Sequence, residues 1–185
     1  MKERGRTTRS LAGQLLLASP AMRDPNFRRT VILMSAHDPD GALGAVLNRP
    51  LGKELGSLNP EFALGPLAHI PLYSGGPVEQ AKLILTAWRW RDEAGEFQLN
   101  FGLDPARAAE MVGQPGTTVR GFLGYAGWGK GQLENEMRRE TWIVAPTEHY
   151  NLESTEGTGL WRMILGSLGP DLKLLADEPD DPGVN

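Results

Sequence analysis

The apolar residues of this chain recur in short runs that predict strands joined by turns. Runs rich in branched and aromatic residues predict strands over residues 13–19, 30–35, 42–47, 72–73, 81–88, 97–101 and 141–145, and from residue 117 onward. Phe97, Leu99 and Phe101 alternate with polar residues, which indicates a strand with one face in water. The turn residues at 37–41 predict a hairpin between two of these strands.

Several segments have the spacing and the end signals of helices. Asp104-Pro105 begins a helix over residues 106–112, which Gly113 ends. Another helix follows Gly131, and in it Glu134 and Arg138 are spaced for an ion pair. A shorter helix is predicted within residues 53–58.

The last predicted helix covers residues 160–168 and ends at Gly169-Pro170. Four of its apolar residues are expected to face inward: Leu160, Met163, Ile164 and Leu168.

The order of these elements mixes hairpins with single helices and does not alternate strand and helix regularly. It therefore predicts an α+β fold around a mixed or antiparallel sheet, and it disfavours a doubly wound nucleotide-binding fold. The length of 185 residues suits one domain, which we place at residues 10–176. Residues 1–9 and 177–185 are predicted to be flexible tails.

Composition narrows the class of protein. The formal net charge is −4, and the chain has no Cys, so it has no disulfide, thiolate nucleophile or Cys-ligated metal. No apolar run is long enough to span a bilayer, and no signal-peptide pattern follows the basic start, so we expect a cytoplasmic location. Nucleic acid is disfavoured as a partner, because the four basic residues of the first nine lack interleaved aromatic residues.

The stretch from Gly121 to Trp142 predicts a strand end, a glycine-rich loop and a helix. Gly124, Gly129 and Lys130 match most of a phosphate-binding loop, but Gly131 stands where Ser or Thr should hold Mg²⁺. A phosphate- or nucleotide-binding enzyme that uses the Gly124–Lys130 loop is therefore the weaker alternative. The favoured interpretation is a tight packing turn with a buried Trp128.

No catalytic constellation emerges from the remaining residues, so we expect no enzymatic activity, no cofactor and no metal. The three histidines, His37, His69 and His149, lack ligand spacing and are predicted to lie at the surface or in turns. Ser74 precedes two glycines, but no partner base marks it as a nucleophile.

Asn48 and Arg49 form a polar pair at the end of a predicted strand. They are expected either to tie neighbouring loops together, which we favour, or to bind an anion. Pro50, which follows them, is expected to block further strand pairing.

Several segments together resemble the bacterial YqgE/AlgH proteins. The matching segments are Gly13–Pro20, Asp24–Thr30, His37–Pro50, Tyr73–Val78, and Gly124–Glu134 with Trp142. The resemblance implies a single α+β domain with a closed or barrel-like β structure flanked by helices. It implies no established activity, cofactor or catalytic residue, although some members carry a transcription-regulator label.

The function that the sequence favours is binding of a protein partner or a small ligand at a patch where three loops converge. The candidate residues of this patch are Asn48, Arg49, Ser74, Gly75, Gly76, Gly127, Trp128, Lys130 and Gln132. A regulator that contacts DNA through the basic arm at residues 1–9 is the alternative from another class. The sequence does not specify the ligand, the partner or the oligomeric state.

Overall fold

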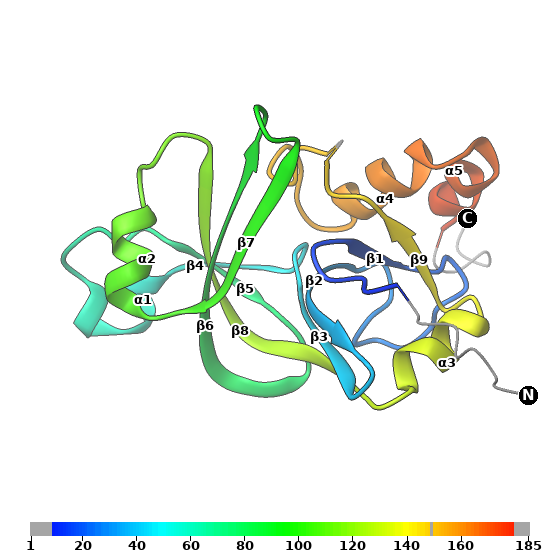
Figure 1. Ribbon diagram of the computed structural model, residues 1–185, viewed down its shortest axis with the longest axis horizontal. Helices are drawn as coiled ribbons and strands as arrows, with labels where there is room; N and C mark the ends of the chain where they lie inside the picture. Colours follow the sequence, from blue (N-terminus) through cyan, green and yellow to red (C-terminus); the bar gives the residue numbers. More distant parts are fainter. Residues whose placement is uncertain (1–8, 149, 180–185) are drawn as a thin grey trace, which may run out of the picture.

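A computed structural model describes residues 9–148 and 150–179. Its strands form a mixed sheet that curls into a half-barrel, with α1 and α2 at one end and α3, α4 and α5 at the other (Figure 1). The predicted α+β class, with a barrel-like sheet flanked by helices, is confirmed. The predictions for the basic arm at residues 1–8, for His149 and for residues 180–185 fall outside the described residues.

Strands and helices follow one another along the chain, with the longest connections between β1 and β2 and between β9 and α4. The strands are β1 (Leu15–Ala18), β2 (Val31–Asp38), β3 (Gly41–Val46), β4 (Pro50–Glu54), β5 (Pro71–Ser74), β6 (Val78–Arg91), β7 (Glu96–Leu103), β8 (Thr117–Gly129) and β9 (Trp142–Ala145). The helices are α1 (Leu55–Leu58), the 3₁₀ turn η1 (Pro60–Phe62), α2 (Pro105–Met111), α3 (Gln132–Arg138), α4 (Thr158–Ser167) and α5 (Pro170–Asp177).

The long strand β8 joins the two halves of the sheet. The strand order is β4-β5-β8-β3-β2-β1-β9, β6 also pairs with β8, and β7 pairs with β6. The first part of β8 lies between β6 and the parallel strand β5, whereas its last residues pair with β3. Gly124, with φ of 74°, lies where the β6–β8 register shifts. A left-handed φ suits Gly, so this residue lets one strand serve both halves.

Apolar side chains fill both faces of the sheet. In β1 every residue is buried: Leu15 and Leu17 belong to a cluster with α4, while Leu16 and Ala18 belong to a cluster with α3. A third cluster packs α1 and α2 against β5 and β6. The helices at the two ends therefore cover different parts of the sheet.

The inward face predicted for the last helix is partly wrong. Leu160 and Ile164 are buried as expected, but Met163 is 39% exposed and Leu168 is 36% exposed. Trp161 and Leu165 are buried in their place. The reason is tertiary, because the Trp161 indole donates a hydrogen bond to the carbonyl of Ala18 in β1 at 2.9 Å and so fixes which side of α4 meets the sheet.

The last predicted helix ends before Gly169-Pro170 as expected, since α4 ends at Ser167, but the further helix α5 was not predicted; Pro170 begins it, because proline fits the first turn of a helix. Two boundary predictions need correction. Pro50 was expected to block pairing, but it begins the edge strand β4, which pairs with β5. The helix predicted within residues 53–58 contains only the four residues of α1. Among the described residues no helix is long and apolar enough to cross a membrane.

Candidate functional site

Asn48 and Arg49 tie loops together, as the sequence favoured. Asn48 is buried; its side-chain oxygen accepts the N–H of Val31 at 2.8 Å, and its amide donates to two carbonyls, one of them on Gly157, at 2.9 Å each. Arg49 donates to three carbonyls within residues 25–28 at distances from 2.6 to 3.4 Å. The loop-tying prediction is confirmed.

The side chains of this pair line a small cavity of about 210 Å³. The cavity is lined by Arg28, Arg29, Asn48, Arg49, Gly157 and Thr158. Burial, together with the charge of Arg28, lowers the pKa of Arg49. Backbone contact brings the second predicted segment close, because Ser74 donates its N–H to the carbonyl of Arg49 at 2.9 Å, but Ser74 does not line this cavity.

Gly75 and Gly76 allow backbone to approach backbone. The N–H of Gly75 donates to the carbonyl of Leu123 at 2.9 Å, and a Cβ at Gly75 would overlap the carbonyl oxygen of Gly124. A Cβ at Gly76 would overlap the carbonyl group of Tyr125. These two glycines therefore serve the fold, by packing the β5–β6 connection against β8.

The third predicted segment is closed by its own contacts. Trp128 is buried, and its indole N–H donates to Oε2 of Glu136 at 2.9 Å. Gln132 accepts a backbone N–H from the end of β8 at 3.0 Å and donates to Oε1 of Glu136 at 3.1 Å. Gly127 pairs with β3, and Lys130 is exposed. The buried-Trp interpretation is confirmed. The cavity beside Asn48 and Arg49 is lined by neither of the other two segments.

The loop predicted at residues 124–131 needs correction, because most of these residues belong to a strand. β8 continues to Gly129, and its residues 126–129 pair with β3. Backbone N–H groups of a phosphate loop must converge on the anion, which a paired strand does not allow. The alternative of a phosphate site at Lys130 therefore loses the loop on which it depended.

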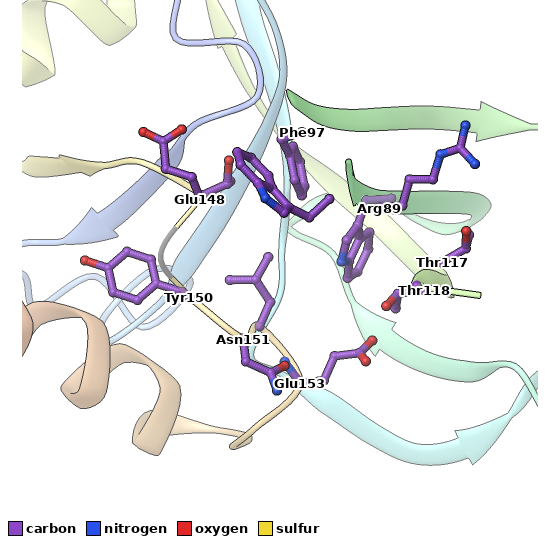
Figure 2. A pocket seen from close by; sticks show the side chains of 13 residues that line it. Arg89, Phe97, Thr117, Thr118, Glu148, Tyr150, Asn151 and Glu153 are labelled. Atoms are coloured by element: carbon purple, nitrogen blue, oxygen red, sulfur yellow. The ribbon is translucent and has the colours of Figure 1, made fainter. Parts of the chain in front are cut away.

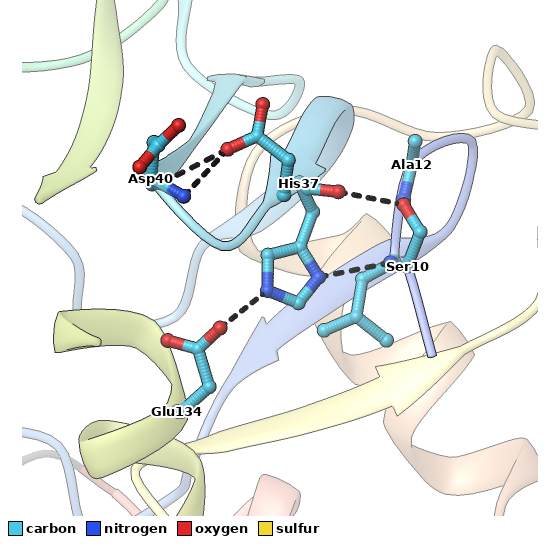
Figure 3. Close-up of polar contacts among 8 residues, drawn as sticks. Ser10, Ala12, His37, Asp40 and Glu134 are labelled. Atoms are coloured by element: carbon cyan, nitrogen blue, oxygen red, sulfur yellow. Dashed lines mark hydrogen bonds and ion pairs between the residues drawn. The ribbon is translucent and has the colours of Figure 1, made fainter. Parts of the chain in front are cut away.

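The prediction for His37 needs correction, because the residue is buried and not at the surface. Its Nδ1 accepts the N–H of Leu11 at 3.1 Å, so Nε2 carries the proton and donates to Glu134 at 2.8 Å (Figure 3). This hydrogen bond lowers the pKa of Glu134. The predicted ion pair of Glu134 with Arg138 is therefore replaced by the hydrogen bond with His37. Arg138 donates to Asn135 at 3.3 Å. His69, as predicted, is exposed, beside Glu54.

A larger cavity, of about 620 Å³, lies between the β6–β7 hairpin and the chain segment that follows β9 (Figure 2). We call it the aromatic cleft. Its aromatic side chains are Trp88, Trp90, Phe97 and Tyr150, and its other lining residues are Arg89, Gly116, Thr117, Thr118, Thr147, Glu148, Asn151, Leu152 and Glu153. Figure 2 shows Glu148, Tyr150 and Asn151 on the segment at one side and Phe97 and Thr118 on the strands at the other.

Strand periodicity explains why aromatic rings gather here. Trp88 and Trp90 are two residues apart in β6 and so share one face, and Trp90 lies opposite Phe97 in β7 with ring centroids 6.5 Å apart. Arg89 belongs to the other face, where its Nε donates to Gln98 at 2.7 Å. Arg89 thus lines the cleft with its guanidinium already engaged by Gln98.

An inner pocket of about 320 Å³ adjoins the aromatic cleft and shares Thr117, Thr118 and Glu153 with it. Arg120 lines this pocket and is 4% exposed. Its guanidinium lies 4.2 Å from the ring centroid of Tyr73 and 5.1 Å from that of Trp88. These are cation–π distances, so two aromatic rings hold the buried charge.

Hydrogen bonds and carboxylates complete the environment of Arg120. It donates to the carbonyls of Leu47 at 3.2 Å and Leu152 at 3.4 Å. Burial lowers its pKa, while Tyr73, Glu153 and Glu156 act in the opposite direction. Burial also raises the pKa of Tyr73, whose hydroxyl donates to Glu156 at 3.3 Å. Arg120 thus fixes the segment after β9 against the sheet.

Comparison with known proteins identifies the family. The profile of the AlgH-like family (DUF179) matches residues 15–173. The chain belongs to the AlgH-like family. The resemblance to YqgE/AlgH proteins is thereby confirmed.

Relatives and solved structures of the AlgH-like chain extend over nearly its whole length. A UPF0301 protein of Streptomyces coelicolor is 37% identical, over 95% of this chain and 96% of that protein. The solution structure of AlgH from Pseudomonas aeruginosa is 30% identical, with a TM-score of 0.65, over 98% and 100% of the two chains. A crystal structure from Corynebacterium diphtheriae is 25% identical, with a TM-score of 0.69, over 90% and 92%. None of these names states an activity.

The candidate patch did not include the residues that form the aromatic cleft of this AlgH-like chain. One signal was available, since Trp88 and Trp90 alternate with Arg89 and Arg91, but the predicted strand ended at residue 88, whereas β6 continues to Arg91. The partners of these two rings were not readable, because Tyr150 and Glu153 meet them only after the chain has passed through β8 and β9.

Proposed function

We propose that this AlgH-like chain is a non-enzymatic, cytoplasmic binding protein, and that it holds a small ligand or a segment of a partner protein in the aromatic cleft. The cleft itself carries the proposal. Its volume of about 620 Å³ lies in the range of small-molecule sites, and rings form much of its wall. Aromatic residues with polar neighbours are enriched where proteins bind partners.

The polar groups of the cleft also favour binding. The carboxylates of Glu148 and Glu153 make no ion pair or hydrogen bond with other described residues, and both residues are exposed. At the candidate patch, in contrast, the side chains of Asn48, Arg49 and Trp128 already have partners within the chain. A ligand gains more from groups whose hydrogen-bonding capacity is not yet used.

The test is a fragment titration of the full chain, labelled with ¹⁵N and followed by NMR. We expect shifts of the indole N–H signals of Trp88 and Trp90, while the indole signal of Trp128, bonded to Glu136, stays in place as an internal reference. The variant Trp90→Leu should lose this response. Shifts that cluster instead around Lys130 and Gln132 would contradict the proposal in favour of the patch predicted from the sequence.

A further inference from the structure

The inference concerns which ligand the aromatic cleft accepts, and it rests on the proposed function. The aromatic cleft and the inner pocket together carry three carboxylates and two arginines. The arginines are Arg89 and Arg120, and both are engaged within the chain, with Gln98 and with two carbonyls respectively. A hydrogen bond to a neutral group leaves a guanidinium charged, so the three carboxylates exceed the two arginines by one formal negative charge. Glu148 and Glu153 are both exposed and place this excess at the opening of the cleft.

The inner pocket shows which kind of group aromatic rings and carboxylates stabilise in this protein. Arg120 is almost fully buried, yet it makes no ion pair with the described residues. Besides its two carbonyl acceptors, its charge is held by the faces of Tyr73 and Trp88 and by carboxylates that act from Glu153 and Glu156. Two aromatic faces with nearby carboxylates thus hold a guanidinium in this fold.

The aromatic cleft presents the same combination to a ligand. Trp90 and Phe97 form a tilted ring pair with centroids 6.5 Å apart, and Tyr150 lines the cleft from the other side. Glu153 borders both cavities, and Glu148 adds a second carboxylate. Aromatic faces attract cations through the negative face of the ring, and carboxylates add a charge that an anion would meet unfavourably.

We infer that the aromatic cleft binds an organic cation, either a guanidinium or an alkylammonium group. The group belongs either to a free small molecule or to an Arg or Lys side chain of a peptide, since both sources present the same chemistry. A metal ion is not the ligand that these residues favour, because no group of three or more potential metal ligands occurs among residues 9–148 and 150–179.

The experiment compares matched probes on the full chain by the indole signals of Trp88 and Trp90. Methylguanidinium and tetramethylammonium test the free cation, and acetate tests the anion. Capped Gly-Arg-Gly and Gly-Lys-Gly test the side chain in a peptide, and capped Gly-norleucine-Gly is the neutral control of similar length. We expect the cationic probes to bind at least about five-fold more tightly than the neutral or anionic ones, and more weakly at high salt.

Variants test which carboxylates are responsible for the affinity for cations. The double change Glu148→Gln and Glu153→Gln should reduce cation affinity by about five-fold while neutral probes are unaffected. Glu61→Gln, at an exposed position in η1 away from the cleft, is the matched control and should change nothing. Trp90→Leu should weaken the binding of every cationic probe.

Each outcome of these titrations supports or contradicts the inference. Tighter binding of the peptides than of the free cations assigns the group to a protein partner, and the reverse assigns it to a small molecule. Equal affinity of Gly-norleucine-Gly and Gly-Lys-Gly at the Trp88 and Trp90 signals would overturn the inference and leave the proposed function standing. No response of these signals to probes of any charge would overturn both.

Discussion

The glycine-rich end of β8 and the aromatic cleft both contain buried tryptophan, carboxylates and polar loops, but they differ in how their polar groups are used. At the end of β8 the indoles of Trp128 and Trp142 both donate to Oε2 of Glu136, at 2.9 and 2.8 Å. Their rings meet edge to face with centroids 5.8 Å apart. In the aromatic cleft the carboxylates of Glu148 and Glu153 have no such donor among the described residues.

This difference indicates that the end of β8 stabilises the fold, whereas the aromatic cleft is available for binding. A group that already has its hydrogen bond gains little from a ligand, and removing its partner costs stability. A group that faces water can exchange that water for a ligand at small cost to the fold. Changes at the end of β8 should therefore alter the free energy of unfolding, and changes in the cleft should alter binding.

The largest effect is expected from Gly75→Ala. The added Cβ would overlap the carbonyl oxygen of Gly124, so the β5–β6 connection could not stay against β8, and we expect a loss of about 4 kcal/mol or more. Gly129→Ala is the matched control, because the nearest atom to its Cβ is Oε1 of Gln132 at 4.0 Å. Urea denaturation of both variants measures the difference. Equal midpoints for the two would refute the role assigned to Gly75.

Glu136→Ala should have the next largest effect, a loss of about 3 kcal/mol in the free energy of unfolding. It leaves two buried indole N–H groups without their acceptor. Glu136→Gln keeps an acceptor oxygen and should lose less than half as much. Urea denaturation followed by tryptophan fluorescence reports both. Cation binding at the aromatic cleft should be unchanged in Glu136→Gln, and its loss there would show that the two regions are not separate.

A smaller effect concerns pH and the pair of Glu134 with His37. The hydrogen bond from His37 holds the pKa of Glu134 below its unfolded value, which is about 4.3. A carboxyl with a depressed pKa contributes stability above the unfolded pKa, and this contribution is lost as the pH falls through the lower, folded pKa.

The stability of the unaltered chain should therefore fall more steeply below about pH 4.5 than that of Glu134→Gln, which has no carboxyl to protonate. Urea midpoints between about pH 3 and pH 6 test this comparison. Glu61→Gln serves as the control for loss of one exposed carboxylate. Identical slopes for the chain and Glu134→Gln would mean that the pair contributes nothing that depends on pH.

The smallest effect on stability is expected from Trp90→Leu, about 1 kcal/mol, because the side chain is only partly buried. The same change should remove most of the binding at the cleft. Thermal unfolding and the fragment titration, measured on one preparation, compare the two quantities. A large loss of stability with intact binding would show that Trp90 serves the packing of the fold and not ligand binding.

Local signals predicted more of the fold than of the site. Asp104 caps α2 as expected, accepting the N–H of Arg107 at 2.9 Å, because a cap depends on residues close in sequence. The hairpin at residues 37–41 also follows from its own turn residues. His37 was misplaced, because its burial depends on Leu11 and Glu134, which are 26 and 97 positions away.

By itself the sequence determined the family, the α+β class and the places where the chain turns, since these depend on residue types and on spacings of a few positions. Only the tertiary structure decided that residues 126–129 continue a strand, and that Trp88 and Trp90 form one cavity with Tyr150 and Glu153. Both outcomes depend on which distant segments pair. That choice is made by burial and hydrogen bonding across the whole sheet, which no short stretch of sequence contains.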